Sequence, residues 1–102
     1  MKSENETVPE TFELRPVIGL TRGLSAADLE TLTVDAIRTH RQLVATADKL
    51  FQALPDDFKT GIAVGGAQHL AYIEAMIAMH AQMQAVNTLL EILGFIPKVP
   101  AN

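Results

Sequence analysis

Apolar residues recur at helical spacing over most of the chain, and the first clear stretch covers about residues 25–54. Viewed down a helix axis, one side is apolar, while the opposite side carries charged residues such as Glu30, Arg38 and Asp48. The apolar side consists of Leu29, Leu32, Ala36, Ile37, His40, Leu43, Val44, Ala47, Leu50, Phe51 and Leu54. The pattern predicts an amphipathic helix with one buried and one solvated face.

Local signals mark both ends of this helix. Ser25 and Asp28 have the spacing of a capping box, in which the Ser25 hydroxyl accepts a hydrogen bond from the Asp28 backbone N–H. The helix is expected to end near Leu54, because the residue before a proline is driven away from helical geometry. Residues 55–66 are rich in glycine and read as a connector with a short helical turn.

A second helix is predicted for about residues 67–93, with Gly94 as its C-cap. It contains two charged residues, Glu74 and Glu91, and three apolar rows. The first row, called the heptad seam below, alternates spacings of 4 and 3 and comprises Tyr72, Met76, Met79, Met83, Val86, Leu90 and Leu93. The second comprises Ala71, Ala75, Ala78, Gln82, Ala85 and Leu89, and the third comprises Leu70, Ile73 and Ile77.

A helix that is apolar nearly all round is a buried helix. The first helix has only one apolar stripe, so it covers one face of the second and leaves the others bare. Exposing the seam would forgo about 1.5–3 kcal/mol per side chain, which rivals a small domain's whole stability of about 5–15 kcal/mol. We therefore predict an all-α fold, an antiparallel hairpin of two long helices that dimerises through the heptad seam into a four-helix assembly.

The N-terminal part divides into two segments. Residues 1–11 are polar and read as a flexible tail. Residues 12–24 mix apolar residues with Pro16, Gly19 and Gly23, which favours an extended arm. This arm either completes the core of its own or a partner subunit, or presents a docking surface. Residues 12–102 then form a single helical domain, with 94–102 as its C-terminal tail.

The amino-acid composition excludes several classes of protein. The 102 residues include 48% hydrophobic side chains and no cysteine, which excludes disulfides and thiolate metal sites. The net charge is −4, and residues 1–14, with one lysine and four glutamates, carry −3 of it. This balance argues against direct nucleic-acid binding, which requires clustered basic residues.

No membrane association is expected. The first ten residues contain no apolar run that would make a signal peptide. The most apolar segment, 71–93, carries His80, Gln82 and Asn87 near its centre, where hydrocarbon would make them costly. We expect a cytoplasmic protein.

Candidate chemistry is sparse. His40, His69 and His80 are the three histidines, and His40 and His80 would approach each other in an antiparallel hairpin. Their spacing matches no zinc motif, and buried, hydrogen-bonded histidines are the simpler interpretation. The methionines of the seam suit a core better than an adaptable binding surface. We find no nucleophile–base pair or nucleotide motif, so we expect no enzyme, no cofactor and no small-molecule substrate.

Several long stretches resemble the TraM family of quorum-sensing antiactivators from conjugative plasmids. They are ELRPVIGLTRGLSAADLETLTVDAIRTHRQLV, LFQALP, FKTG and MHAQMQAVNTLLEILGFIPKV, within residues 12–100. The resemblance implies a cytoplasmic homodimer of helical hairpins that binds TraR, a LuxR-type transcriptional activator. It also implies that the protein blocks the activator's DNA binding and so holds conjugal transfer genes off.

Activator contacts are expected near the helix ends, where apolar residues outside regular helices make anchors. The candidates are Arg15, Leu20, Arg22, Phe95, Ile96, Pro97, Lys98 and Val99. Phe95 and Ile96 would equally well cap the bundle. The alternative function is a structural or adaptor helical homodimer with a different protein target.

Overall fold

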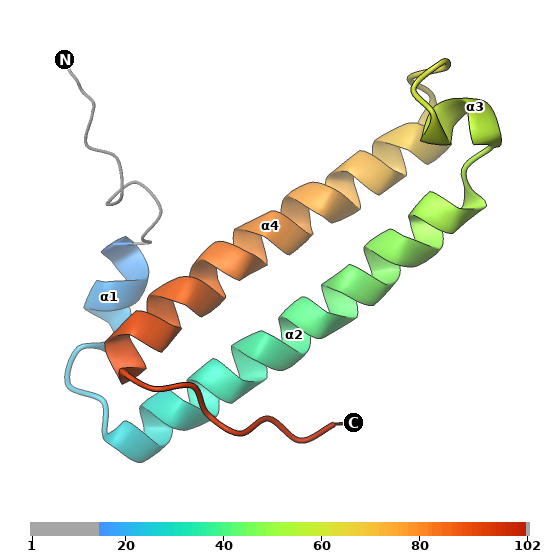
Figure 1. The fold of residues 1–102 in the computed structure, drawn as a ribbon. Helices are drawn as coiled ribbons and strands as arrows, with labels where there is room; N and C mark the ends of the chain where they lie inside the picture. The colour runs from blue at the N-terminus through green and yellow to red at the C-terminus, as the bar shows by residue number, and fades with distance from the viewer. Residues whose placement is uncertain (1–14, 102) are drawn as a thin grey trace, which may run out of the picture.

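The computed structural model describes residues 15–101, which form helices and no strand (Figure 1). In chain order the helices are α1 (Arg15–Thr21), α2 (Ala26–Ala53), α3 (Asp56–Lys59) and α4 (Ala67–Leu93). The predicted all-α fold is confirmed. The predicted polar tail, 1–11, and the first residues of the arm, 12–14, lie outside the described residues.

Helix α2 begins and ends where its local sequence requires. Ser25 is the N-cap, and its Oγ accepts a hydrogen bond from the Asp28 N–H at 3.0 Å. Leu54 follows the helix with extended geometry, φ −70° and ψ 143°, because Pro55 disfavours helical geometry in the residue before it. Both predicted boundaries are therefore confirmed.

The arm is a short helix, and the expectation of an extended segment was wrong. Pro16 lies in the first turn of α1, where its missing N–H is no loss, since no helical carbonyl is available there. The Thr21 hydroxyl donates to the Val17 carbonyl at 2.9 Å in the last turn. Gly23, with φ +87°, then turns the chain toward α2. Gly19 therefore lies within a short helix, and Gly23 follows its end.

Helices α2 and α4 pack against each other along their lengths (Figure 1). Gln82 Nε2 donates to the Ala36 carbonyl at 3.1 Å, and the rings of Phe51 and Tyr72 lie 5.5 Å apart. Positions rise along α2 as their partners fall along α4, so the pair is antiparallel. The predicted hairpin is confirmed, with α3 in the connector.

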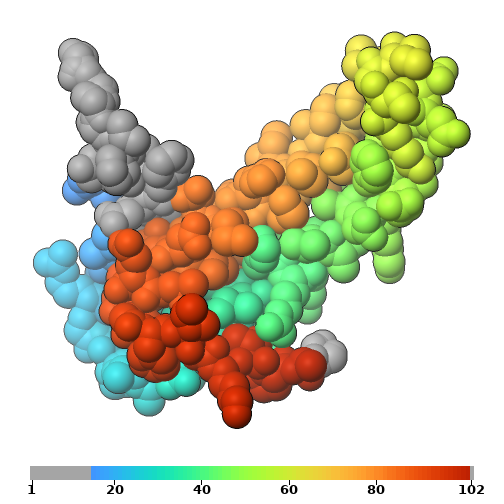
Figure 2. All heavy atoms as spheres, in the orientation of Figure 1, coloured from blue at the N-terminus to red at the C-terminus, as the bar shows by residue number. Residues whose placement is uncertain are grey.

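Past α4 the chain folds back over α2. Gly94 is the C-cap, with φ 89° and an N–H that donates to the Leu90 carbonyl at 2.8 Å. Pro97 is buried, and Arg41 of α2 donates to the Pro100 carbonyl at 3.3 Å. Figure 2 shows this C-terminal segment lying against the start of the hairpin. Helix α1 packs against α4 at the same end (Figure 1).

The core of the hairpin is small. Its buried apolar residues are Leu29, Ala47, Leu54, Val86 and Leu89. The molecule measures 18 Å in its shortest dimension, which is less than two helix diameters of about 10–12 Å each. A single layer of helices covers one side of each helix, whereas stable domains normally pack two or more layers. The opposite sides therefore remain open.

Candidate protein-binding surfaces

The side of α4 that faces away from α2 is open and apolar. Leu70 is 55% exposed and Ile77 64% exposed, and Ile73 between them is also exposed. A hollow of about 570 Å³ on this side is lined by Tyr72, Ile73, Met76, Ile77, His80, Ala81 and Gln84. We call the row Leu70, Ile73, Ile77, Ala81 and Gln84 the outer face of α4. Its first four members are exposed, and Gln84 is half-buried. Exposed apolar rows of this kind mark surfaces that bind other proteins.

The open apolar surface continues toward α2. A second hollow of about 300 Å³ lies between the two long helices and is lined by Val44, Ala47, Asp48, Phe51, Tyr72, Met76 and Met79. Tyr72 and Met76 line both hollows. Val44 of α2, at its far edge, is 41% exposed. The apolar surface thus extends from α2 across Met76 to the outer face.

The predicted dimer residues are divided between the inside and the edge of the hairpin. Val86 is buried within the chain, and Tyr72 contacts Phe51 of its own α2. The other five members of the heptad seam, Met76, Met79, Met83, Leu90 and Leu93, are half-buried. The Gln82 row meets α2, as its bond to Ala36 requires. The third row, noted in the sequence without a role, is the one left exposed.

The predicted activator-binding segments lie together at one end of the hairpin. This hairpin end comprises α1 and residues 94–101 (Figure 1). Leu20 and Ile96 are each 82% exposed, and Phe95 is half exposed. Arg15, Arg22 and Lys98 are exposed as well, and Val99 is half-buried. Pro97 is buried.

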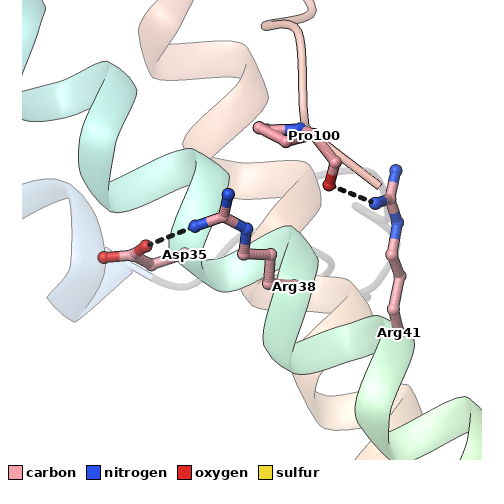
Figure 3. Close-up of polar contacts among 4 residues, drawn as sticks. All are labelled: Asp35, Arg38, Arg41 and Pro100. Atoms are coloured by element: carbon pink, nitrogen blue, oxygen red, sulfur yellow. Dashed lines mark hydrogen bonds and ion pairs between the residues drawn. The ribbon is translucent and has the colours of Figure 1, made fainter. Parts of the chain in front are cut away.

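Two arginines of α2 border this end. Arg41 holds the Pro100 carbonyl, and Arg38 Nη1 lies 3.9 Å from Asp35 Oδ1 (Figure 3). With Gln42 and Ala45 they line a hollow of about 410 Å³. The Arg38 pair is solvent-exposed and contributes little stability, since water screens such charges. Sequence reasoning placed Arg38 on the solvated side of the helix and did not foresee the tail that Arg41 holds there.

The three histidines occupy separate environments. His69 Nδ1 accepts a hydrogen bond from the Gly65 N–H at 2.7 Å, and its ring meets Phe58 edge-on. His40 is half-buried on α2, whereas His80 lines the hollow on the outer side of α4. In the part of the chain that the structure describes, no three histidine, aspartate or glutamate side chains form a group that could hold a metal ion.

None of the helices within residues 15–101 combines the length and the hydropathy required to cross a bilayer.

The fold is a helical hairpin with open apolar surfaces, and comparisons with known proteins identify its family. A model of the family described as prokaryotic transcriptional repressor TraM matches residues 1–98. Two curated relatives named transcriptional repressor TraM match over the full length of both chains. One, from Rhizobium radiobacter, is 66% identical, and the other, from Agrobacterium fabrum (strain C58 / ATCC 33970), is 63% identical.

A solved structure agrees with these matches. It is described as the crystal structure of a second quorum sensing antiactivator, TraM2, from A. tumefaciens strain A6. The two chains are 75% identical, with a TM-score of 0.85, over 86% of this chain and 99% of the other. The chain belongs to the TraM family of transcriptional repressors. The role of this family is regulatory.

Proposed function

We propose that this protein is a quorum-sensing antiactivator that binds a LuxR-type transcriptional activator similar to TraR. By occupying the activator it blocks DNA binding and represses conjugal transfer genes. The observation that carries the proposal is the exposed apolar hairpin end, in a chain similar to a solved antiactivator. The activator works on DNA in the bacterial cytoplasm, so the inhibitor acts there too.

The hairpin end suits capture of another protein. Leu20 and Ile96 expose apolar side chains to solvent, and the same two segments carry the exposed cations Arg15, Arg22 and Lys98. Apolar anchors with a polar rim are the usual arrangement of an interface hot spot. The tail that carries Phe95 and Ile96 is held by buried Pro97 and by Arg41, which lowers the ordering cost of binding.

The active form in this proposal is a homodimer. The outer face of α4 exposes Leu70, Ile73 and Ile77, and the 18 Å thickness leaves the hairpin with one helical layer. A second hairpin would supply the other layer and give a four-helix assembly. The half-buried seam residues at the edge, Met76 and Met83 among them, would be covered as well. The dimer leaves both hairpin ends free.

A gel-shift titration with the cognate activator tests the function. Increasing amounts of this protein are expected to abolish the activator–operator complex and to saturate at a fixed molar ratio, as stoichiometric sequestration requires. Unchanged operator binding at a large excess of this protein would contradict the proposal.

A pull-down from a lysate without the activator distinguishes the proposed antiactivator from the alternative, an adaptor with a different protein target. An antiactivator is expected to retain no abundant protein there. A specific, stoichiometric protein recovered from such a lysate would favour the adaptor function. Sedimentation equilibrium of the purified protein tests the dimer independently of any partner.

A further inference from the structure

The start of α4 is joined to the connector by a histidine side chain. The N-cap residue, Gly66, has no side chain and forms no side-chain cap bond. His69, the third residue of α4, reaches back instead, and its Nδ1 accepts a hydrogen bond from the Gly65 N–H at 2.7 Å. In a capping box, a glutamate or glutamine at the third helical position bonds a backbone N–H at the helix entrance in a similar way. Here the acceptor at that position is a titratable group.

The bond from Gly65 requires a neutral imidazole. A neutral ring has one nitrogen that accepts and one that donates, so His69 carries its hydrogen on Nε2. A charged ring carries hydrogen on both nitrogens and has no acceptor, whichever way it turns. The Phe58 ring, 5.9 Å from His69 at an angle of 68°, is an apolar neighbour that does not replace the lost acceptor. Protonation of His69 therefore breaks the bond to Gly65.

The surroundings of His69 offer a charged ring no counter-ion. The titratable side chains of the neighbouring elements are Asp48 and Lys49 at the end of α2, Asp56, Asp57 and Lys59 of α3, and Tyr72 and Glu74 of α4. Within the described residues, none of these carboxylates forms an ion pair with His69. The first turn of a helix also carries positive partial charge from the macrodipole, which is unfavourable for a cation. A charge on His69 thus loses a hydrogen bond and gains no salt bridge.

The effect is confined to the second half of the connector. The Ala63 N–H donates to the Asp57 carbonyl at 3.0 Å, and the Leu70 N–H donates to the Gly66 carbonyl at 2.9 Å. Both are backbone bonds without a titratable group, so protonation leaves α3 and the first turn of α4 in place. Residues 64–65 lie between these two bonds and are the part released. Figure 1 shows the connector, with α3, at the end of the hairpin away from α1.

We propose that His69 is a pH-sensitive clasp, which in its neutral form holds residues 64–65 on the start of α4 and in its protonated form releases them. Histidine side chains change charge between about pH 5 and 8, so the clasp is closed at the upper end of this range and open at the lower end. The bond is exposed to solvent, and its loss is expected to increase the open population about twofold to tenfold. The clasp is independent of the proposed antiactivator function and lies at the opposite end from the proposed activator contacts.

Amide NMR over this pH range tests the clasp. The Gly65 amide signal is expected to shift in a single histidine transition. Its protection against hydrogen exchange, corrected for the intrinsic effect of pH, is expected to fall about twofold to tenfold as the pH is lowered. Gly94 is the internal control, because its N–H donates at 2.8 Å to the Leu90 carbonyl, which does not titrate. A Gly65 signal and protection that do not change with pH would overturn the proposal.

Two substitutions of His69 separate its titration from its packing. His69→Gln supplies a neutral acceptor at every pH and is expected to keep the Gly65 amide in the closed state throughout. His69→Leu removes the acceptor and is expected to keep it in the open state throughout. His80→Gln is the matched control, because it removes an exposed histidine of the same helix and should leave the native transition unchanged. A Gly65 transition that survives in both His69 variants, or disappears in His80→Gln, would overturn the assignment.

Urea denaturation measures the same effect on the whole fold. Relative to His69→Gln, the native protein is expected to lose stability as the pH falls through the histidine range, because its unfolded state then binds one more proton. The ratio of the two unfolding equilibrium constants should change about twofold to tenfold. Other titrating groups are common to both proteins and cancel in this ratio, so a ratio independent of pH would contradict the clasp. These measurements involve no activator, so the clasp and the antiactivator role can fail separately.

Discussion

The rings of Tyr72 and Phe51 lie 5.5 Å apart at an angle of 50°, which joins the start of α4 to the end of α2. Lys59 of α3 lies over the Phe51 ring, with its Nζ 5.7 Å from the ring centre. The cluster closes the connector end of the hairpin. A residue of the heptad seam thus contributes to the fold of a single chain.

Tyr72→Ala is expected to lower the free energy of unfolding by about 2–3 kcal/mol, less than for a fully buried aromatic because Tyr72 is half-buried. Urea denaturation followed by circular dichroism measures the change. Ile96→Ala, at an 82% exposed position, is the control and is expected to stay within about 0.5 kcal/mol of the native protein. Equal stability of Tyr72→Ala and the native chain would contradict the ring contact.

Ser25→Ala is expected to destabilise the protein by about 1 kcal/mol, because the Asp28 N–H loses its acceptor at the start of α2. Thermal unfolding provides the measurement. Thr39→Ala, exposed in the middle of the same helix, is the matched hydroxyl deletion and is expected to cause no comparable loss. Indistinguishable effects of the two changes would argue against a capping role for Ser25.

Arg41→Ala is expected to release the C-terminal segment without unfolding the hairpin. The bond from Arg41 to the Pro100 carbonyl is exposed, so its loss should increase the open population of the tail about twofold to tenfold. Trypsin cleavage after Lys98 reports this opening as a faster rate. Arg22→Ala removes an arginine elsewhere at the hairpin end and should leave that rate unchanged. An unaltered rate in Arg41→Ala would show that Pro97 alone holds the tail.

Ile96→Asp is expected to weaken inhibition of the activator at least tenfold in the gel-shift titration, because it puts a charge where an apolar anchor is proposed. Ile62→Asp is the control, since Ile62 is 78% exposed in the connector at the opposite end of the hairpin. Both variants are expected to keep native helicity. Stronger impairment by Ile62→Asp would move the activator site to the connector.

The helices and their ends were predictable because each depends on a few neighbouring residues. Ser25 caps α2, Pro55 ends it, and Gly94 ends α4. The antiparallel hairpin followed from two long helices joined by a short connector. The arm was mispredicted because proline and glycine were interpreted as helix breakers, although a seven-residue helix tolerates Pro16 in its first turn.

The candidate site was predicted in part. The two segments of the hairpin end were identified as apolar stretches outside long helices, and the structure brings them to one end. Sequence alone did not separate Ile96, which is free, from Pro97, which is buried. That difference arises from the path of the tail over α2, a contact between residues 59 positions apart.

The sequence by itself determined the helices, their direction and the excess of apolar surface on α4. Only the tertiary structure decided the rotation of α4, and therefore which apolar row is inside. Three rows with similar hydrophobicity lie around that helix, so periodicity alone does not choose among them. The choice depends on the packing against α2, where Gln82 donates to the Ala36 carbonyl and Leu89 of the same row is buried. This rotation buries Val86 and leaves Ile77 open.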